Sequence, residues 1–420
     1  MRPCRSVATR AAAMAASRAL SIWRSSFTPS PSGPGSLEPS RLPPRLQRPG
    51  LSRCRRGGKW SCAVIESLER FMFLRNAWYA AMWSEALGAG NLVPRTILDE
   101  PLVFFRKASG GVAALTDLCP HKFAPLHLGK LLPGDRVQCG YHGLEFSPSG
   151  ECVRNPHGSE RISPNCKVRG YSTIERHSMI WIWMGNSPAD PSLIPDYSFM
   201  DDDSEYDITR RDFLRIKANY RLVADNLMDL SHSPYLHDGV IGGPDTIKSD
   251  IRVEQEGNTV KVHRPKQDVR PTGLLDRVYR KDGEPVDIWS TIRWTAPCYI
   301  LNDTGAYPPG GQRTEGSGVI GAHLLTPETE DTTLYHFAAT RTGNVLDKNE
   351  DQVVFRQWFS DARRYAFAEQ DEPMIEAQYQ MRKTYPAATT RPILLETDAG
   401  PVRCNRILDE LIRNEQQISS

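Results

Sequence analysis

The sequence predicts an α+β protein with two folded domains of different character. In the first, short runs of β-branched and aromatic residues such as Leu102-Val103-Phe104-Phe105 are typical of strands. The second mixes such runs with longer helical segments, without the regular alternation of strand and helix that a parallel sheet requires. A stretch rich in Pro and Asp at residues 186–200 separates them and is expected to be a linker.

The first 71 residues differ from the rest in composition. Residues 1–60 contain 11 Arg and one Lys against a single acid, Glu38, whereas the remainder contains 40 basic and 49 acidic side chains. This basic extension lacks apolar periodicity, so we expect residues 1–71 to be disordered. We favour an extension that precedes a natural start at Met72 over an organelle transit peptide, which would also be rich in Arg and Ser.

Composition excludes several classes of protein. No apolar stretch is long enough for a membrane span, and the acidic balance beyond residue 60 gives no electrostatic reason to bind nucleic acid. Nine cysteines without regular spacing argue against a disulfide framework. They favour a reducing compartment, the cytoplasm.

The predicted elements follow in chain order. The first domain is expected at residues 72–185 and ends on Met179–Met184, where bulky apolar side chains at every position indicate a strand covered on both faces. The second is expected at 201–410. Its predicted elements are a helix around 219–232, a strand at 333–338, and helices within 351–383 and 402–416.

Two short segments each offer one thiolate and one imidazole. Residues 119–121 read Cys-Pro-His and residues 139–142 read Cys-Gly-Tyr-His. A cluster of two inequivalent irons needs this division, with thiolates on one iron and imidazoles on the other. A zinc site is the alternative, but the one-residue gap in the first pair is unusual for zinc fingers.

The stretch from Cys119 to Leu144 resembles the Rieske [2Fe–2S] motif of Rieske non-haem iron oxygenases. The resemblance implies that Cys119, His121, Cys139 and His142 hold the cluster. The same motif also occurs in electron-carrier ferredoxins and respiratory Rieske proteins. The motif alone therefore does not indicate catalysis.

A second group of polar residues interrupts the predicted helix at 219–232. Asn226, Asp229 and His232 stand at i, i+3 and i+6, on one stripe of a helix. We expect Pro234 to end or kink the helix after His232, so that His237 turns back to the same site. The alternative is a helix salt bridge between Asp229 and His232, with His237 in a loop.

This D-x-x-H-x-x-x-x-H pattern is similar to the mononuclear iron motif of the oxygenase family. The resemblance implies that His232 and His237 bind iron and that Asp229, with Asn226 nearby, acts in catalysis. In the family's trimer, Asp229 would link His142 of one subunit to His232 of the next. Several acids could supply the third ligand, namely Glu369, Asp371, Glu372 and Glu376. The resemblance to the family's carboxylate-bearing helix favours Asp371. Asp371 could otherwise be a helix N-cap.

Three further stretches resemble the vanillate and dicamba O-demethylase branch: Met72–Tyr79, Ile292–Trp294 with Asn302, and His323–Thr329. This implies an all-β Rieske domain followed by a helix-grip-like α+β catalytic domain on an antiparallel sheet, in a homotrimer. Its cofactors would be a [2Fe–2S] cluster and mononuclear Fe(II), with O₂ as co-substrate. Electrons would come from NADH through a separate flavin and iron–sulfur reductase.

The implied reaction is monooxygenation of the methyl carbon in a methoxylated aromatic acid, which gives an unstable hemiacetal and then formaldehyde and a phenol. Asn302 and His323 are the candidates to anchor the substrate, although both could be ordinary buried strand residues. The same machinery could instead hydroxylate a ring, oxidise a side chain or N-demethylate another aromatic compound. A Rieske electron carrier with an accessory domain is the alternative from a different class.

Overall fold

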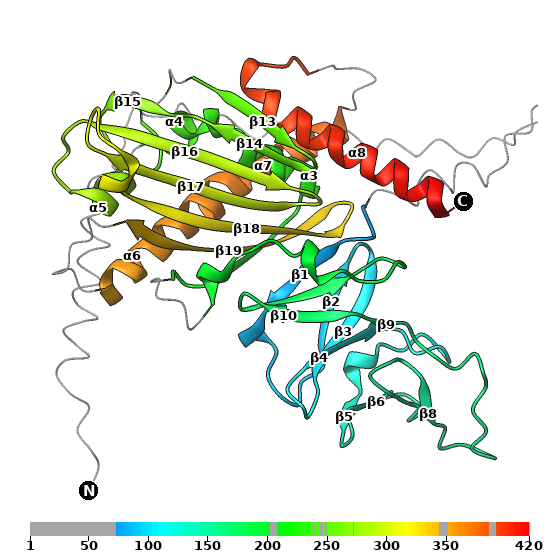
Figure 1. Cartoon of the computed structure of the whole chain (residues 1–420). Coiled ribbons are helices and arrows are strands. Elements are labelled where there is room, and N and C mark those ends of the chain that lie inside the picture. Colours follow the sequence, from blue (N-terminus) through cyan, green and yellow to red (C-terminus); the bar gives the residue numbers. More distant parts are fainter. Residues whose placement is uncertain are drawn as a thin grey trace, which may run out of the picture. The chain divides into compact units, whose positions relative to one another are not determined.

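A computed structural model describes residues 73–419, except for 202–207, 239, 244–246, 248–249, 272, 344–351 and 386–391. The predicted disorder of residues 1–71 lies outside the described residues. Three small antiparallel sheets form the first half of the described chain, and one large antiparallel sheet with helices forms the second (Figure 1). This is the predicted α+β architecture.

The three small sheets have the strand orders β2-β3-β4-β9, β5-β6-β7-β8 and β1-β11-β10. Their strands are β1 (Trp78–Trp83), β2 (Val93–Ile97), β3 (Glu100–Arg106), β4 (Val112–Thr116), β5 (Lys130–Leu132), β6 (Arg136–Gln138), β7 (Glu145–Phe146), β8 (Cys152–Arg154), β9 (Gly170–Tyr171), β10 (Thr173–Arg176) and β11 (Met179–Trp183). Every residue of β11 is buried, which confirms the prediction of a strand covered on both faces.

Residues 186–200, expected as a linker, contain two short 3₁₀ turns at Pro191–Leu193 and Ser198–Met200. Ile194, Tyr197 and Met200 are buried in a core that also contains residues of β1, β11 and the large sheet. This segment is therefore packed against both halves of the chain.

The large sheet has the order β12-β19-β18-β17-β16-β14-β13, and β15 also pairs with β16. All of its strand pairs are antiparallel. The strands are β12 (Asp212–Ile216), β13 (Arg252–Glu256), β14 (Thr259–His263), β15 (Lys266–Val269), β16 (Val286–Thr295), β17 (Tyr299–Tyr307), β18 (Ser317–Thr329) and β19 (Thr332–Gly343).

Helices cover one face of this sheet, with α3 and α6 crossing it in Figure 1. The helices are α3 (Tyr220–Met228), α4 (Ser233–Leu236), α5 (Gly273–Tyr279), α6 (Gln352–Arg364), a π-helix (Tyr365–Asp371), α7 (Glu372–Thr384) and α8 (Ala399–Ser419). Short 3₁₀ turns lie at Ser84–Ala86, Leu126–Leu128, Leu230–His232, Arg313–Glu315 and Glu396–Asp398. No helix within the described ranges is long and apolar enough to cross a membrane.

The two faces of the sheet separate the helices from the β-rich half. On β17, Ile300 packs into the core with α3 and α8, whereas Tyr299 and Leu301 belong to the core that contains Trp78. The Tyr299 hydroxyl donates to the Trp78 carbonyl at 2.5 Å. Because successive side chains of a strand point to opposite faces, residues of the Ile300 parity, including Asn302, face the helices.

The predicted helix at 219–232 breaks earlier than expected. Helix α3 ends at Met228, and Asp229 adopts an extended conformation with φ −103° and ψ 100°. Its carboxylate accepts from the Ser231 N–H at 2.8 Å and so caps the following 3₁₀ turn. Pro234, predicted to break the helix, instead lies in the first turn of α4, where its missing N–H costs nothing.

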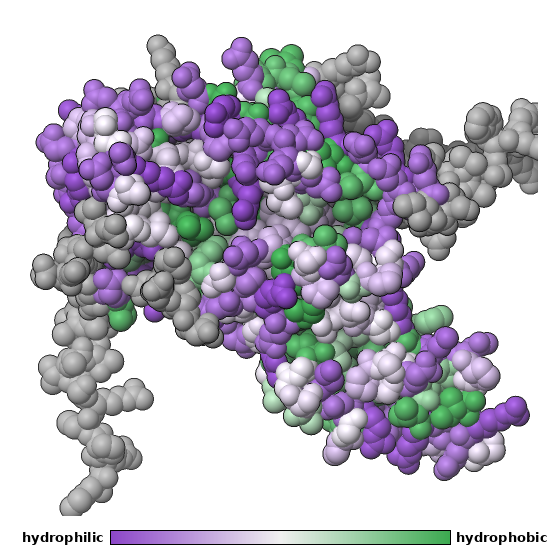
Figure 2. Space-filling view, viewed as in Figure 1, coloured by the Kyte–Doolittle hydropathy of each residue, from purple (hydrophilic) through white to green (hydrophobic). Residues whose placement is uncertain are grey.

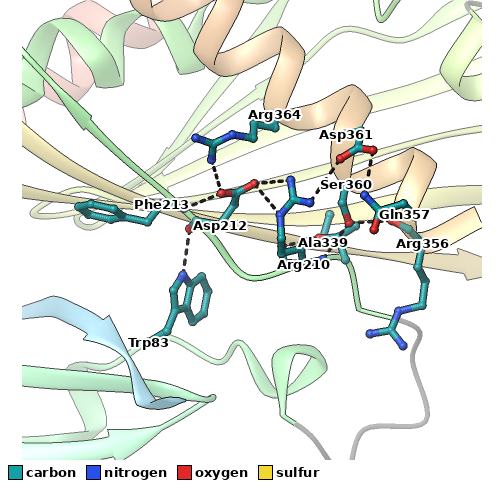
Figure 3. Close-up of polar contacts among 11 residues, drawn as sticks. Trp83, Arg210, Asp212, Phe213, Ala339, Arg356, Gln357, Ser360, Asp361 and Arg364 are labelled. Carbon is teal, nitrogen blue, oxygen red and sulfur yellow. Dashed lines mark hydrogen bonds and ion pairs between the residues drawn. The ribbon is translucent and has the colours of Figure 1, made fainter. Parts of the chain in front are cut away.

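Asp212, at the start of the edge strand β12, anchors α6 to the sheet (Figure 3). Its side chain is buried and pairs with Arg364 of α6 and with Arg210, whose Nη2 lies 3.0 Å from Oδ2. The Arg210 N–H donates to Ser360 Oγ at 2.8 Å. The Trp83 indole donates to the Asp212 carbonyl at 2.9 Å, which ties β1 to the same point.

We predict that Asp212→Asn lowers the free energy of unfolding by about 1.5–3 kcal/mol, because it removes a buried carboxylate that accepts hydrogen bonds from two guanidinium groups. Chemical denaturation checks this. The control is Asp361→Asn, since Asp361 is exposed and pairs with Arg210 at 3.3 Å, an interaction worth less than about 1 kcal/mol. Equal stability of the two variants would contradict the anchoring role.

Candidate metal centres and substrate cavity

The two cysteine loops of the β-rich half have the same backbone hydrogen bonds. In each, the cysteine N–H donates to the carbonyl five residues later, at 2.9 Å for Cys119 and 2.8 Å for Cys139. The N–H four residues after each cysteine returns to the cysteine carbonyl, from Phe123 and from Gly143. Both of these residues have positive φ, 56° and 73°. The loops therefore present their side chains in a matching way.

The four predicted cluster ligands meet between these loops. Cys119 and Cys139 are both buried in the same small core, and the ring centroids of His121 and His142 are 4.4 Å apart. Burial raises the pKa of Cys119 to about 11, with the Cys139 thiol adding to the effect. The backbone N–H groups of His121 and Lys122 donate to the Cys119 sulfur and so favour a thiolate there. Two buried sulfurs beside two imidazoles fit a Rieske cluster.

Two neighbouring histidines outside the predicted ligand set have defined partners. His157 lies beside the cluster ligands, with its Nε2 2.7 Å from the His142 carbonyl oxygen. The His127 ring contacts the Asp117 carboxylate, whose other oxygen accepts from the His127 N–H at 2.8 Å. His157 therefore contacts a predicted ligand residue, which its distance along the sequence did not indicate.

A second set of ligands comes from the 3₁₀ turn after α3, from the end of α4 and from the end of the π-helix. Asp371 Oδ1 is 3.2 Å from His237 Nε2 and 3.6 Å from His232 Nε2. One ligand atom from each of these residues lies within 4.8 Å of the others, so the three could hold a metal ion. Two imidazoles and one carboxylate are the donor set of non-haem Fe(II) oxygenases.

The outer nitrogens of both histidines are held in place. His232 Nδ1 lies 2.5 Å from the Asp229 carbonyl oxygen, and His237 Nδ1 lies 2.9 Å from Gln370 Oε1. Since both acceptors take an Nδ1–H, both Nε2 atoms are free to bind a metal. The ligand set therefore has oriented imidazoles, and Gln370 is a participant that the sequence did not reveal.

For each imidazole, burial lowers the pKa and the nearby Asp371 carboxylate raises it, and the balance differs between the two. Burial lowers the pKa of His232, despite the attraction of Asp371. Burial is the largest single influence on His237 and disfavours its charged form, but the hydrogen bond to Asp371, the charge of Asp371 and the hydrogen bond to Gln370 together outweigh it, so the pKa of His237 is raised. Asp371 is thus the group that balances positive charge at this point.

The two other predicted residues of this region contact the same centre in different ways. Asn226 Nδ2 donates to Asp371 Oδ1 at 3.2 Å, while its own Oδ1 is buried without a partner among the described residues. Asp229 reaches His232 through its main-chain oxygen, because both carboxylate oxygens accept from Ser231.

A cavity of about 120 Å³ opens from the three ligands toward the sheet. This volume is close to that of a 150 Å³ protein cavity that binds benzene, so it matches a single aromatic ring. Asn302 and His323, the two residues predicted to anchor a substrate, both line it. Asn302 Oδ1 accepts from Thr304 Oγ1 at 2.7 Å, which leaves the amide N–H donors for a ligand.

Basic side chains that no sequence pattern had indicated also line the cavity. They are Arg264, Lys266 and Arg363, whereas Asp371 is the one acid among the described lining residues. Burial, with Arg264 nearby, lowers the pKa of Lys266 to about 8. The position of Arg363 eight residues before Asp371, on the same helical run, is the signal that could have revealed it.

Two family models match the chain. Residues 77–171 match the Rieske [2Fe-2S] domain, and residues 216–414 match the vanillate O-demethylase oxygenase C-terminal domain. The first range contains all four predicted cluster ligands, and the second contains His232, His237 and Asp371.

Curated proteins and solved structures resemble the chain over most of its length. The oxygenase component of chloroacetanilide N-alkylformylase from Rhizorhabdus wittichii is 36% identical, with 82% of this chain and 97% of that protein covered. The oxygenase component of dicamba O-demethylase from Stenotrophomonas maltophilia is 36% identical over 81% of this chain and 98% of its own length.

A crystal structure of dicamba monooxygenase with non-haem iron and dicamba has a TM-score of 0.68 and 35% identity, and the match covers 82% of this chain and 99% of that one. The chain therefore belongs to the Rieske non-haem iron oxygenases, in the branch that contains the vanillate and dicamba O-demethylase oxygenase components.

Proposed function

We propose that this chain is the oxygenase component of a monooxygenase that O-demethylates a methoxylated aromatic acid. The observation that carries the proposal is the pairing of two metal centres in one chain, with a ring-sized cavity at the second. A Rieske electron carrier needs only the first centre. The metal ligands and cavity in the second half of the chain favour an enzyme.

The roles of the residues follow from their chemistry. Cys119, Cys139, His121 and His142 would hold the cluster, and His232, His237 and Asp371 the mononuclear iron. When bound, the cluster supplies single electrons and the mononuclear iron activates O₂ beside the substrate. The Nδ1 hydrogen bonds of His232 and His237 keep the two imidazoles oriented toward one point. Asn226 holds the Asp371 carboxylate in place, because its Nδ2 donates to Asp371 Oδ1.

Hydroxylation of the substrate's methyl carbon gives a hemiacetal, which releases formaldehyde and a phenol. Asn302 and His323 would orient the aromatic acid, since both present N–H donors to the cavity. The apolar lining, which includes Ile292, Ile300 and Phe367, excludes water around the ring.

Electron transfer would take place between subunits of a trimer, through Asp229. Three bulky apolar side chains near the cluster loops, Phe123, Leu128 and Tyr141, are 71%, 71% and 67% exposed. Figure 2 shows hydrophobic surface in the region of β5–β8. Such surface is typical of a contact with another protein. A neighbouring subunit and the reductase that delivers electrons from NADH are the partners that this role requires.

N-Dealkylation by the same machinery is the second candidate function. The relative at 36% identity named as the oxygenase component of an N-alkylformylase supports it. Oxidation at a carbon bonded to nitrogen in place of oxygen would require the same ligands and the same electrons. The two functions differ only in the substrate that the cavity accepts.

The purified holoprotein, supplied with a compatible reductase, NADH and a panel of methoxybenzoates, should release formaldehyde together with the matching phenol. The control panel contains N-methylated aromatic compounds. If only these compounds release formaldehyde, the function is N-dealkylation and not O-demethylation. Ring diols without formaldehyde would contradict both candidates while leaving the oxygenase assignment intact.

We predict that His232→Ala loses the mononuclear iron and all product formation but keeps the visible absorption of the cluster. The reason is that His232 lies in a different half of the chain from the four cluster ligands. Absorption spectra and metal analysis of the variant check this. A colourless variant that remains folded would refute the assignment of two separate centres.

We expect Asp229→Asn to retain both metals, because the main-chain oxygen that contacts His232 is unchanged. Turnover should fall about 10- to 100-fold, the range for an outer partner of metal ligands, if the carboxylate links His142 of one subunit to His232 of the next. Asparagine still caps the Ser231 turn, so this substitution removes the charge while preserving the local geometry. The measurement is the rate of cluster reoxidation in a single turnover, with Asp361→Asn as control. An unchanged rate would exclude Asp229 from the electron path.

A further inference from the structure

We propose that Arg363 binds the carboxylate of the aromatic substrate in a site above Gly321, with His323 and Asn302 as supporting donors. The inference rests on the proposed function and deepens it, because it assigns a positively charged anchor to the acid group. It also makes the acid group a requirement for binding.

The guanidinium of Arg363 is buried without a matching anion. The residue is 7% exposed, and its Nε and Nη2 atoms have no hydrogen-bond partner among the described residues. Asp212 attracts it only at a distance, since the Asp212 carboxylate contacts Arg210 and Arg364. Burial lowers the pKa of Arg363 to about 10, so the side chain remains charged at neutral pH. A buried, unpaired charge is costly, and a bound anion would remove that cost.

The donors converge over Gly321, which lets them approach the strand because it has no side chain. A methyl group built on Gly321 would lie 3.1 Å from Arg363 Nη1, 3.2 Å from Nη2 and 3.3 Å from His323 Nε2, all tighter than an ordinary contact. Asn302 is the direct cross-strand partner of Gly321. A side chain at position 321 would therefore push these nitrogens out of the arrangement in which they meet at the cavity wall.

His323 is arranged to donate to an anion. Burial, with the charge of Arg363 nearby, holds the pKa of His323 well below its usual value, so the imidazole is neutral. Its Nδ1 lies 2.5 Å from the Tyr335 hydroxyl, and burial raises the pKa of that hydroxyl, which remains a donor. In the tautomer in which Nδ1 accepts from the Tyr335 hydroxyl, the proton of the neutral ring lies on Nε2, which is the atom that faces Gly321.

The helical run that carries Arg363 also supplies the ring wall and the metal ligand. Arg363, Phe367 and Asp371 stand at i, i+4 and i+8, and all three line the cavity. The Phe367 ring centroid is 5.4 Å from that of His323. This spacing places the acid group at one end of a bound ring and the metal ligands toward the other.

The planar fork of arginine matches a carboxylate in a bidentate pair, which favours a carboxylate as the anion. The anchoring of α6 by the Arg364–Asp212 pair fixes the turn that carries Arg363. Arg363 is thus a binding residue that is positioned from outside the cavity by its neighbour.

The test uses benzoate, which lacks a methoxy group, so its binding does not depend on demethylation. Calorimetry with the iron-loaded holoprotein should show that Arg363→Met weakens benzoate binding about 10- to 100-fold, the range for a hydrogen bond to a charged group. The affinity for the neutral isostere benzamide should change less than about threefold. The control is Arg382→Met, which removes an exposed charge from α7.

A second variant, Gly321→Ala, retains Arg363 and should also weaken benzoate binding, because the added methyl group would press on the nitrogens of Arg363 and His323 and displace them. Equal losses for benzoate and benzamide in Arg363→Met would overturn the proposal in favour of a structural role. Benzoate binding that depends on iron but not on Arg363 would also overturn it, by placing the carboxylate on the metal. If the protein binds benzoate selectively through Arg363 but does not demethylate methoxybenzoates, the proposed function is wrong and the carboxylate site stands.

Discussion

The second half of the chain must bring the Asp371 carboxylate close to the imidazoles of His232 and His237, and the arrangement of its sheet and helices serves this constraint. Asp371 meets His232 and His237 from a helical segment more than 130 residues further along the sequence. Its partners must therefore be brought together by the sheet, not by local structure. The alternating faces of β17 and β18 allow this, because one parity supports the helices and the other packs on the β-rich half.

Two irregular helices provide the geometry that regular ones would not. Helix α3 stops at Met228, and a 3₁₀ turn and α4 then carry the two histidines. Opposite them, a π-helix at Tyr365–Asp371 joins α6 to α7, and such helices often occur at functional sites. The Asp212 anchor fixes α6 at the sheet edge. The same helical run thus presents Arg363, Phe367 and Asp371 to a single cavity.

The sequence predicted the architecture and the groups that meet at the two centres, since strand composition and ligand spacing are local signals. The helix break was misplaced because Pro234 is a strong local breaker signal, whereas the capping of Ser231 by Asp229 is visible only in the folded chain. Gln370 and Arg363 were missed for a related reason. Their roles depend on which faces of α6 and of the π-helix meet the sheet. The spacing of Arg363 from Asp371 indicates such a face only once Asp371 is known to be a ligand.

A Rieske cluster together with a separate mononuclear iron in one chain distinguishes an oxygenase from an electron carrier. The content of iron, zinc and acid-labile sulfide in the fully loaded protein tests whether both are present. Two separate centres require about three irons and two sulfides per chain, with little zinc. Two irons per chain, both in the cluster, would indicate an electron carrier. Zinc without sulfide would contradict the presence of a Rieske cluster.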